Sequence, residues 1–302
     1  FCQGGSVVLT ATAASTYAWS TGATTQTITV SASGNYSVTL TNASGCTSSS
    51  PVTVVTANAL PTATITAGGA TTFCQGGSVT LTASPSTSYV WSNGATSASI
   101  TVSTAGSYTV QVANNSGCTA TSAATTVVVN ALPSASITAG GSLSICAGST
   151  VNLTASTGAA YLWSNGATTA TIAASNAGNY SVQVTNAAGC ISTSAVSSVV
   201  VNALPTPSIS SVGSTTLCQG ASVTLTTANG PGLTYQWQNN GTNVPGATAA
   251  SFVANTAGSY TVQVTNAAGC SNTTSATTVV VNALPVASIA NSGSNTICAG
   301  SS

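Results

Sequence analysis

The sequence predicts an all-β chain of tandem β-sandwich domains arranged as an extended rod. Short segments of alternating polar and apolar residues recur throughout the chain, and no segment shows the 3.6-residue period of a helix. The pattern also repeats as a whole: Cys2, Cys74, Cys146, Cys218 and Cys298 open successive units at spacings of 72, 72, 72 and 80 residues. A repeat of this length, made of short strands, is typical of a tandem array of small domains.

One motif organises every unit. Gly-x-Tyr-x-Val-x-Val-x-Asn-x-x-Gly-Cys occurs at 34–46 (with Leu40 in place of the second Val), 106–118, 178–190 and 258–270. Tyr108, Val110 and Val112 share one parity, which predicts a strand with one buried face. Asn-x-x-Gly predicts a turn after it, because Asn and Gly tolerate the positive φ of a tight hairpin.

The second unit shows the expected order of elements. Gly68-Gly69 and Gly76-Gly77 predict turns, and Asn93-Gly94 predicts a type I′ hairpin. The expected strands are 61–65, 72–74, 78–83, 89–92, 97–102, 108–114 and 119–129. About seven short strands separated by turns are typical of a β-sandwich.

Asn-Ala-Leu-Pro marks the junctions, at 58–61, 130–133, 202–205 and 282–285. Pro has no backbone N–H to donate to a neighbouring strand, and it holds the preceding residue in an extended conformation. We therefore expect a short, semi-rigid junction. The predicted domains are therefore 1–58 (truncated at its N-terminus), 59–130, 131–202, 203–282 and the start of a further repeat at 283–302. We expect the chain to be an internal segment of a longer array.

The fourth unit is eight residues longer than the others, with the additions around 230–232 and 239–246. Insertions are tolerated best in surface loops. The residues Asn239, Asn240, Gly241 and Asn243 form a candidate binding loop, and neutral drift of a surface loop is the simpler interpretation.

The composition excludes several functions. The chain has no Lys, Arg, Asp, Glu or His. It therefore has no basic patch for nucleic acid and no group for general acid–base catalysis, so we expect no enzyme and no catalytic residue. Without His or a Cys-x-x-Cys motif we also expect no metal site and no cofactor. No apolar run is long enough to cross a membrane.

The residues Cys-x-Gly-x-Ser-Val-Thr-Leu-Thr, Tyr-x-Trp-Ser-Asn-Gly and the organising motif together resemble bacterial immunoglobulin-like repeats. Such repeats occur in large surface adhesins, commonly exported by the type IX route. The resemblance implies an extracellular location, a core Trp in the third strand and a tyrosine corner. These residues are Trp19, Trp91, Trp163 and Trp237, with Tyr36, Tyr108, Tyr180 and Tyr260.

Two departures from that family matter. Its repeats usually carry Asp near the Asn-x-x-Gly turn, whereas this chain has none. Ala83 and Val110 occupy the positions of the usual disulfide between the two sheets, so that bond is absent. The cysteines that are present are Cys2, Cys46, Cys74, Cys118, Cys146, Cys190, Cys218, Cys270 and Cys298. Two per unit favours disulfides and an oxidising, extracellular setting.

In a sandwich of this strand order, Cys74 lies at one end of the unit and Cys118 at the other. A strand of roughly nine residues spans about 30 Å, whereas a disulfide needs Cα atoms within about 7 Å. Pairing between neighbouring units is therefore favoured: Cys2–Cys118, Cys74–Cys190 and Cys146–Cys270, with Cys46 joined to a preceding unit and Cys218 and Cys298 to following ones. Pairing within a unit, Cys74 with Cys118, and free buried thiols stay open.

The function predicted from these observations is structural: the stalk or fibre segment of an extracellular surface adhesin, whose main partners are neighbouring repeats of the same chain. One alternative is a module that binds glycans or a protein through the loops of the fourth repeat. Another is a self-assembling extracellular filament, driven by lateral self-association of an uncharged surface with exposed edge strands.

Overall fold

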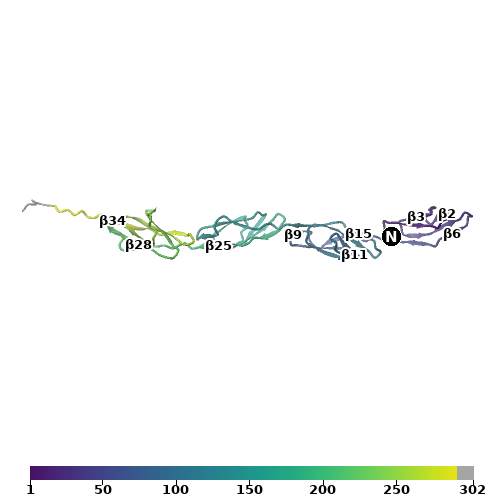
Figure 1. Cartoon of the computed structure of the whole chain (residues 1–302), viewed down its shortest axis with the longest axis horizontal. Coiled ribbons are helices and arrows are strands. Elements are labelled where there is room, and N and C mark those ends of the chain that lie inside the picture. Colours follow the sequence, from purple (N-terminus) through teal and green to yellow (C-terminus); the bar gives the residue numbers. More distant parts are fainter. Residues whose placement is uncertain (291–302) are drawn as a thin grey trace, which may run out of the picture. The chain divides into compact units, whose positions relative to one another are not determined.

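The computed structural model describes residues 1–290, in which it contains the strands β1 to β34 and no helix (Figure 1). The all-β fold class predicted by the sequence is confirmed. The chain divides into two compact units: Phe1–Pro133 with Ala187–Cys190, and Ser134–Asn186 with Ile191–Ser302. Each unit holds two separate hydrophobic cores. We use "first" to "fourth repeat" for the predicted domains 1–58, 59–130, 131–202 and 203–282, whose boundaries stay a prediction.

The second repeat shows the sandwich in full. Its strands are β8 (Ile65–Ala67), β9 (Thr72–Cys74), β10 (Val79–Ala83), β11 (Ser88–Trp91), β12 (Ser99–Val102), β13 (Gly106–Tyr108), β14 (Val110–Ala113), β15 (Thr119–Thr121) and β16 (Thr125–Asn130). One layer has the order β12-β10-β8. The other layer contains β11-β14-β15 and β13-β16-β9, in which β9 and β16 are parallel. Only Thr109 separates β13 from β14, so these two groups continue one another.

The first repeat has one strand fewer in its smaller layer. Its strands are β1 (Val7–Thr10), β2 (Thr16–Trp19), β3 (Thr27–Val30), β4 (Gly34–Tyr36), β5 (Val38–Thr41), β6 (Thr47–Ser49) and β7 (Thr53–Val55). β1 pairs with β3 alone, so among the described residues nothing occupies the place that β8 takes beside β10.

The third repeat has the same layers as the second. Its strands are β17 (Ile137–Ala139), β18 (Ser144–Cys146), β19 (Val151–Ala155), β20 (Ala160–Trp163), β21 (Thr171–Ala174), β22 (Gly178–Tyr180), β23 (Val182–Thr185), β24 (Ile191–Thr193) and β25 (Ser197–Asn202). The order β17-β19-β21 faces β20-β23-β24 and β18-β25-β22, and β18 runs parallel to β25.

In the fourth repeat the larger layer is one continuous sheet of order β27-β34-β32-β29-β30, with β33 also paired to β32. Its strands are β26 (Ile209–Val212), β27 (Thr216–Cys218), β28 (Val223–Thr227), β29 (Thr234–Asn239), β30 (Thr242–Asn243), β31 (Ser251–Ala254), β32 (Gly258–Thr265), β33 (Ser271–Thr273) and β34 (Thr277–Asn282). β32 corresponds to the two pieces β13 and β14, which identifies these as one interrupted strand.

Three details of the predicted elements are wrong. The expected first strand, 61–65, lies later, as β8. The expected single strand 119–129 is divided into β15 and β16, because the Ser122 hydroxyl accepts the backbone N–H of Val110 at 3.1 Å and replaces a ladder partner there. The predicted type I′ hairpin at Asn93-Gly94 does not form. Only Gly94 has a positive φ, and the turn carries the chain from one layer to the other, since β11 and β12 lie in different sheets.

Candidate functional site

The junction between the first and second repeats is built around the Asn-x-x-Gly-Cys hairpin. The side-chain oxygen of Asn114 accepts hydrogen bonds from the backbone N–H groups of Ser116 (3.1 Å) and Cys118 (3.0 Å). Gly117 takes the positive φ of the turn, at 76°. Asn114 itself has a negative φ, so it shapes the hairpin through its side chain rather than through the backbone conformation that the sequence predicts. The hairpin thus presents the Cys118 sulfur in a fixed position.

The other half of this junction is the end of the first repeat. Cys2 and Asn58 form a parallel β-bridge, and the N–H of Gln3 donates to the Asn58 carbonyl at 2.7 Å. The backbone N–H and the side-chain amide of Asn58 both donate to the carbonyl of Phe1. Cys2 is therefore held beside the residue at which the chain leaves the first repeat.

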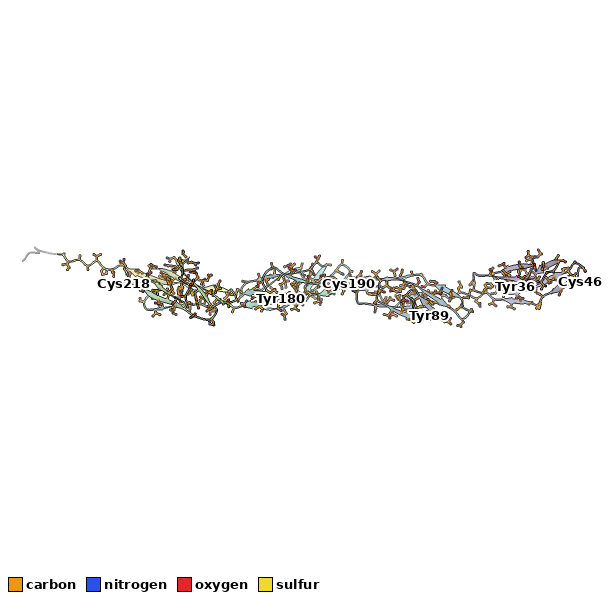
Figure 2. The ribbon with its side chains drawn as sticks, viewed as in Figure 1. Tyr36, Cys46, Tyr89, Tyr180, Cys190 and Cys218 are labelled. Carbon is orange, nitrogen blue, oxygen red and sulfur yellow. A yellow bond between two sulfur atoms is a disulfide. The ribbon has the colours of Figure 1, made fainter. Side chains whose placement is uncertain are left out.

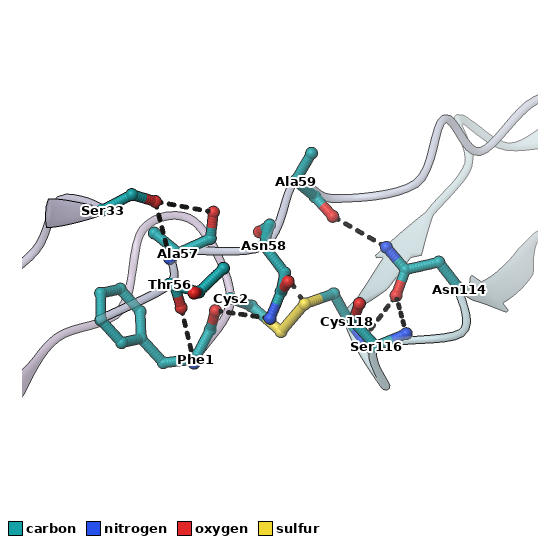
Figure 3. Close-up of a disulfide and its surroundings, with 10 residues drawn as sticks. All are labelled: Phe1, Cys2, Ser33, Thr56, Ala57, Asn58, Ala59, Asn114, Ser116 and Cys118. Atoms are coloured by element: carbon teal, nitrogen blue, oxygen red, sulfur yellow. Dashed lines mark hydrogen bonds between the residues drawn. A yellow bond between two sulfur atoms is a disulfide. The ribbon is translucent and has the colours of Figure 1, made fainter. Parts of the chain in front are cut away.

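A disulfide joins the two halves. Cys2 and Cys118 are bonded with their Cα atoms 5.5 Å apart, and the Cys118 sulfur lies 3.9 Å from the carbonyl oxygen of Asn58 (Figure 3). The side-chain amide nitrogen of Asn114 donates to the carbonyl of Ala59 at 2.8 Å. The backbone connection and the disulfide therefore run side by side at this junction.

The same arrangement occurs twice more. Cys74 is bonded to Cys190, and Cys146 to Cys270, each with Cα atoms 5.6 Å apart. At the junction between the third and fourth repeats, the Asn266 side-chain amide donates to the Ala203 carbonyl at 2.9 Å, as Asn114 does to Ala59. The three bonds are the three pairs that the sequence analysis favours. The alternative pair Cys74–Cys118 does not form, because each of these cysteines is bonded elsewhere.

The remaining cysteines are not bonded in the described part of the chain. Cys46 and Cys218 are free and exposed (Figure 2), whereas Cys118, the bonded counterpart of Cys46, is fully buried. The expected pairing of Cys46 with a preceding repeat and of Cys218 with a following one stays a prediction. Cys298 lies outside the described residues.

The aromatic residues singled out by the sequence pack within the sandwiches, and all except the half-buried Tyr36 are buried. Each Trp indole N–H donates to a backbone carbonyl of its own repeat, and each Tyr hydroxyl donates to the carbonyl four residues before it. The Trp residues 19, 91, 163 and 237 bond to Thr25, Ser97, Thr169 and Ala249. The Tyr residues 36, 108, 180 and 260 bond to Ala32, Thr104, Asn176 and Thr256. These contacts give the aromatic residues a structural role.

The candidate binding loop of the fourth repeat is a tight hairpin between β29 and β30. Asn240 and Gly241 have φ of 49° and 79°, as a type I′ turn requires. The amides are used within the repeat: Asn239 donates to the Tyr260 hydroxyl, Asn240 accepts from the Ser259 N–H, and Asn243 accepts from the Gln238 amide. A ligand-binding role for this loop stays a prediction.

Sequence reasoning missed one set of structural side chains. Ser122, Ser194 and Thr274 are the buried polar residues of the described chain, and each hydroxyl accepts a backbone N–H of the organising strand at 3.1 Å. A Ser or Thr at this place in all four repeats, with Ser50 in the first, was the available signal. It is weak in a sequence that is rich in Ser and Thr throughout.

The chemistry that these junctions carry is disulfide cross-linking. The chain contains no carboxylate, imidazole, ammonium or guanidinium side chain. Residues 1–290 include no cluster of three ligand-type side chains that could hold a metal ion. Over the same residues the structure has no helix able to span a membrane.

No protein-family model and no curated protein matches the sequence. Among solved structures the chain is similar to a three-domain E-to-A variant of titin, with TM-score 0.37 and 15% identity over 70% of this chain and 95% of that one. It is also similar to murine CEACAM1b, with TM-score 0.29 and 15% identity over 49% of this chain and 100% of that one. A third similar structure is that of the eight N-terminal Ig domains of Down Syndrome Cell Adhesion Molecule, with TM-score 0.24 and 14% identity over 92% of this chain and 45% of that one. The strand order and pairing give the repeats their immunoglobulin-like β-sandwich.

Proposed function

We propose that the chain is a load-bearing segment of an extracellular stalk or fibre. The observation that carries this proposal is the doubling of each junction: a disulfide stands beside the backbone where one repeat gives way to the next. A domain that only presents a binding loop gains little from such a bond. A segment that carries tension between two attached objects gains a second covalent connection at each junction.

The covalent route through the chain is much shorter than the chain itself. From Cys2 it crosses to Cys118, follows the backbone to Cys146, crosses to Cys270 and reaches Asn282. Only 28 and 12 residues of backbone lie on this route. At about 3.3–3.6 Å per extended residue its length is limited to roughly 150 Å, against roughly 1,000 Å for the unbridged chain. Most residues of the four hydrophobic cores lie off this route, so tension applied at the two ends is not transmitted through them.

The setting proposed for this segment is extracellular, since disulfides persist in oxidising compartments. The uncharged surface suits a passive spacer, because no salt bridge or titrating carboxylate contributes to its stability. A bacterial surface adhesin exported by the type IX route is the specific context that we propose from the family resemblance.

Small-angle scattering tests the proposal. A variant with Cys46, Cys218 and Cys298 changed to Ser keeps the three disulfides and excludes cross-linked oligomers. We expect a stiff, elongated monomer in which each repeat adds about 35–40 Å, from one strand length plus a junction. A compact or freely jointed particle in the oxidised state would contradict the role as a spacer.

A further inference from the structure

The side chains that many endoproteases recognise are absent or covered in this chain. It has no Lys, Arg, Asp or Glu, so proteases that cleave beside basic or acidic residues find no site. Proteases that cleave after aromatic residues need those side chains to be accessible, and no Phe, Tyr or Trp is exposed in residues 1–290. Cleavage at an aromatic residue therefore needs local unfolding of a repeat.

Leucine is the next large side chain that such proteases accept, and the junction motif shields it. Between Cys2 and Cys270 the exposed leucines are Leu60, Leu132, Leu162 and Leu204. Three of them precede Pro in Asn-Ala-Leu-Pro, and Pro after a cleavage site offers no N–H to the protease and places a rigid ring there. The exception, Leu162, lies within β20 and is paired with Gln183 of β23. Each leucine that a junction exposes is thus followed by Pro.

Cleavage after small residues in exposed loops stays open, and the disulfides determine its effect. The loops are closed by Cys2–Cys118, Cys74–Cys190 and Cys146–Cys270. The first and second loops overlap over residues 74–118, and the second and third overlap over residues 146–190. Every peptide bond from residue 2 to residue 270 therefore lies inside at least one loop. A disulfide bridges any single cut in this range.

The overlaps also make any two cuts harmless. Cuts after Leu60 and Leu132, in successive junctions, give fragments 1–60, 61–132 and 133–302. The first disulfide then joins the first fragment to the second, and the second disulfide joins the second fragment to the third. Three cuts separate the two ends only in one arrangement: one cut in 119–145, one in a neighbouring overlap, and one in the segment beyond that overlap.

We propose that this segment is built to keep its two ends covalently connected in the presence of extracellular endoproteases. Each cleavage adds one water across a peptide bond and leaves a carboxylate and an amine. The uncharged composition removes the sites of whole protease classes, Pro shields the junction leucines, and the overlapping disulfides bridge the cuts that remain. This gives the missing charge a function.

The disulfide part is tested with trypsin, in the variant that lacks Cys46, Cys218 and Cys298. Trypsin cuts only where a Lys is introduced, because the chain has no Lys or Arg. The first variant carries Ala124→Lys, Thr168→Lys and Ala195→Lys, at exposed positions. Trypsin is added until reducing mass spectrometry shows all four fragments. Denaturing, non-reducing mass spectrometry should then show two products: 1–124 bonded to 169–195, and 125–168 bonded to 196–302.

The matched control carries Thr96→Lys in place of Ala124→Lys, so it receives the same number of cuts. Thr96 is exposed and lies in the first overlap. Under the same denaturing, non-reducing conditions the control should stay one species, heavier than the uncut chain by three waters. Moving one cut from residue 124 to residue 96 thus decides whether the ends separate.

The role of Pro is tested with a protease that cleaves after aromatic residues and leucine. Pro61→Ala turns the exposed Leu60 into an ordinary site, and fragment 1–60 should appear after reduction. Without reduction this fragment should stay attached through Cys2–Cys118. Pro85→Ala changes a nearby proline that follows Ser84, and neither this control nor the parent should release fragment 1–60.

Three results would overturn the proposal: cleavage of the parent after Leu60 as fast as in Pro61→Ala, a first Lys variant that stays in one piece, or a control that separates. The inference goes beyond the load-bearing role, because it concerns cleavage and not tension. A chain that scattering showed to be freely jointed would still give these digests, so the two proposals fail separately.

Discussion

The side-chain amide of Asn114 spans the junction to the carbonyl of Ala59, at 2.8 Å. The same amide caps the hairpin that carries Cys118. One residue therefore fixes both the position of the sulfur and the position of the backbone that passes beside it. One neutral side chain therefore contacts both halves of the junction.

Asn114→Ala should expose the Cys2–Cys118 bond to reductant. The variant loses the hairpin cap and the bond to Ala59, and each net hydrogen bond contributes about 1 kcal/mol, or roughly fivefold in the opening equilibrium. We expect Cys2–Cys118 to be reduced about fivefold or more faster, measured by alkylation and mass spectrometry. Cys146–Cys270 in the same molecule is the matched control, and equal acceleration of both bonds would refute the local explanation.

Leu153→Ala should destabilise the third repeat by about 2–5 kcal/mol, because the side chain is completely buried. The nearby Leu162 is 48% exposed, so Leu162→Ala is the control and should cost less than about 0.5 kcal/mol. Amide hydrogen exchange of this repeat measures both changes. Similar losses of protection in the two variants would contradict the assigned core.

The sequence predicts much of this fold and junction, for identifiable reasons. Strong alternation around Tyr108 and Leu81 specifies strands and their buried faces. Strand length favours pairing between units, and the observed bonds decide against Cys74 with Cys118. The turn at Asn93-Gly94 was mispredicted because a dipeptide does not reveal whether its flanking strands share a sheet.

Gly241→Ala should cost about 1–2 kcal/mol, because Gly241 has φ of 79° and a Cβ is strained in the left-handed region. Gly141→Ala is the matched control, since Gly141 has no positive φ and a Cβ there meets no atom within 4 Å. Exchange protection of β29 and β30 reports the effect of Gly241→Ala, and that of β17 and β18 reports the control. A neutral Gly241→Ala would show that the hairpin tolerates another turn type.

Stability should not depend on pH between about 5 and 7, because side chains that titrate there are absent and both states bind the same number of protons. The slope of unfolding free energy against pH is then zero. Added salt should leave the unfolding free energy unchanged below the concentrations at which salting-out acts. Chemical denaturation at several pH values checks this, and a slope near 1.4 kcal/mol per pH unit would reveal a one-proton difference.

Single-molecule stretching between residue 1 and residue 282 tests the central claim most directly, in the variant that lacks Cys46, Cys218 and Cys298. With the three disulfides intact the covalent route limits the contour length to roughly 150 Å. The measured force should therefore rise steeply near that extension, without unfolding steps. After reduction it should extend toward roughly 1,000 Å through separate unfolding events. Full extension of the oxidised chain would contradict the account.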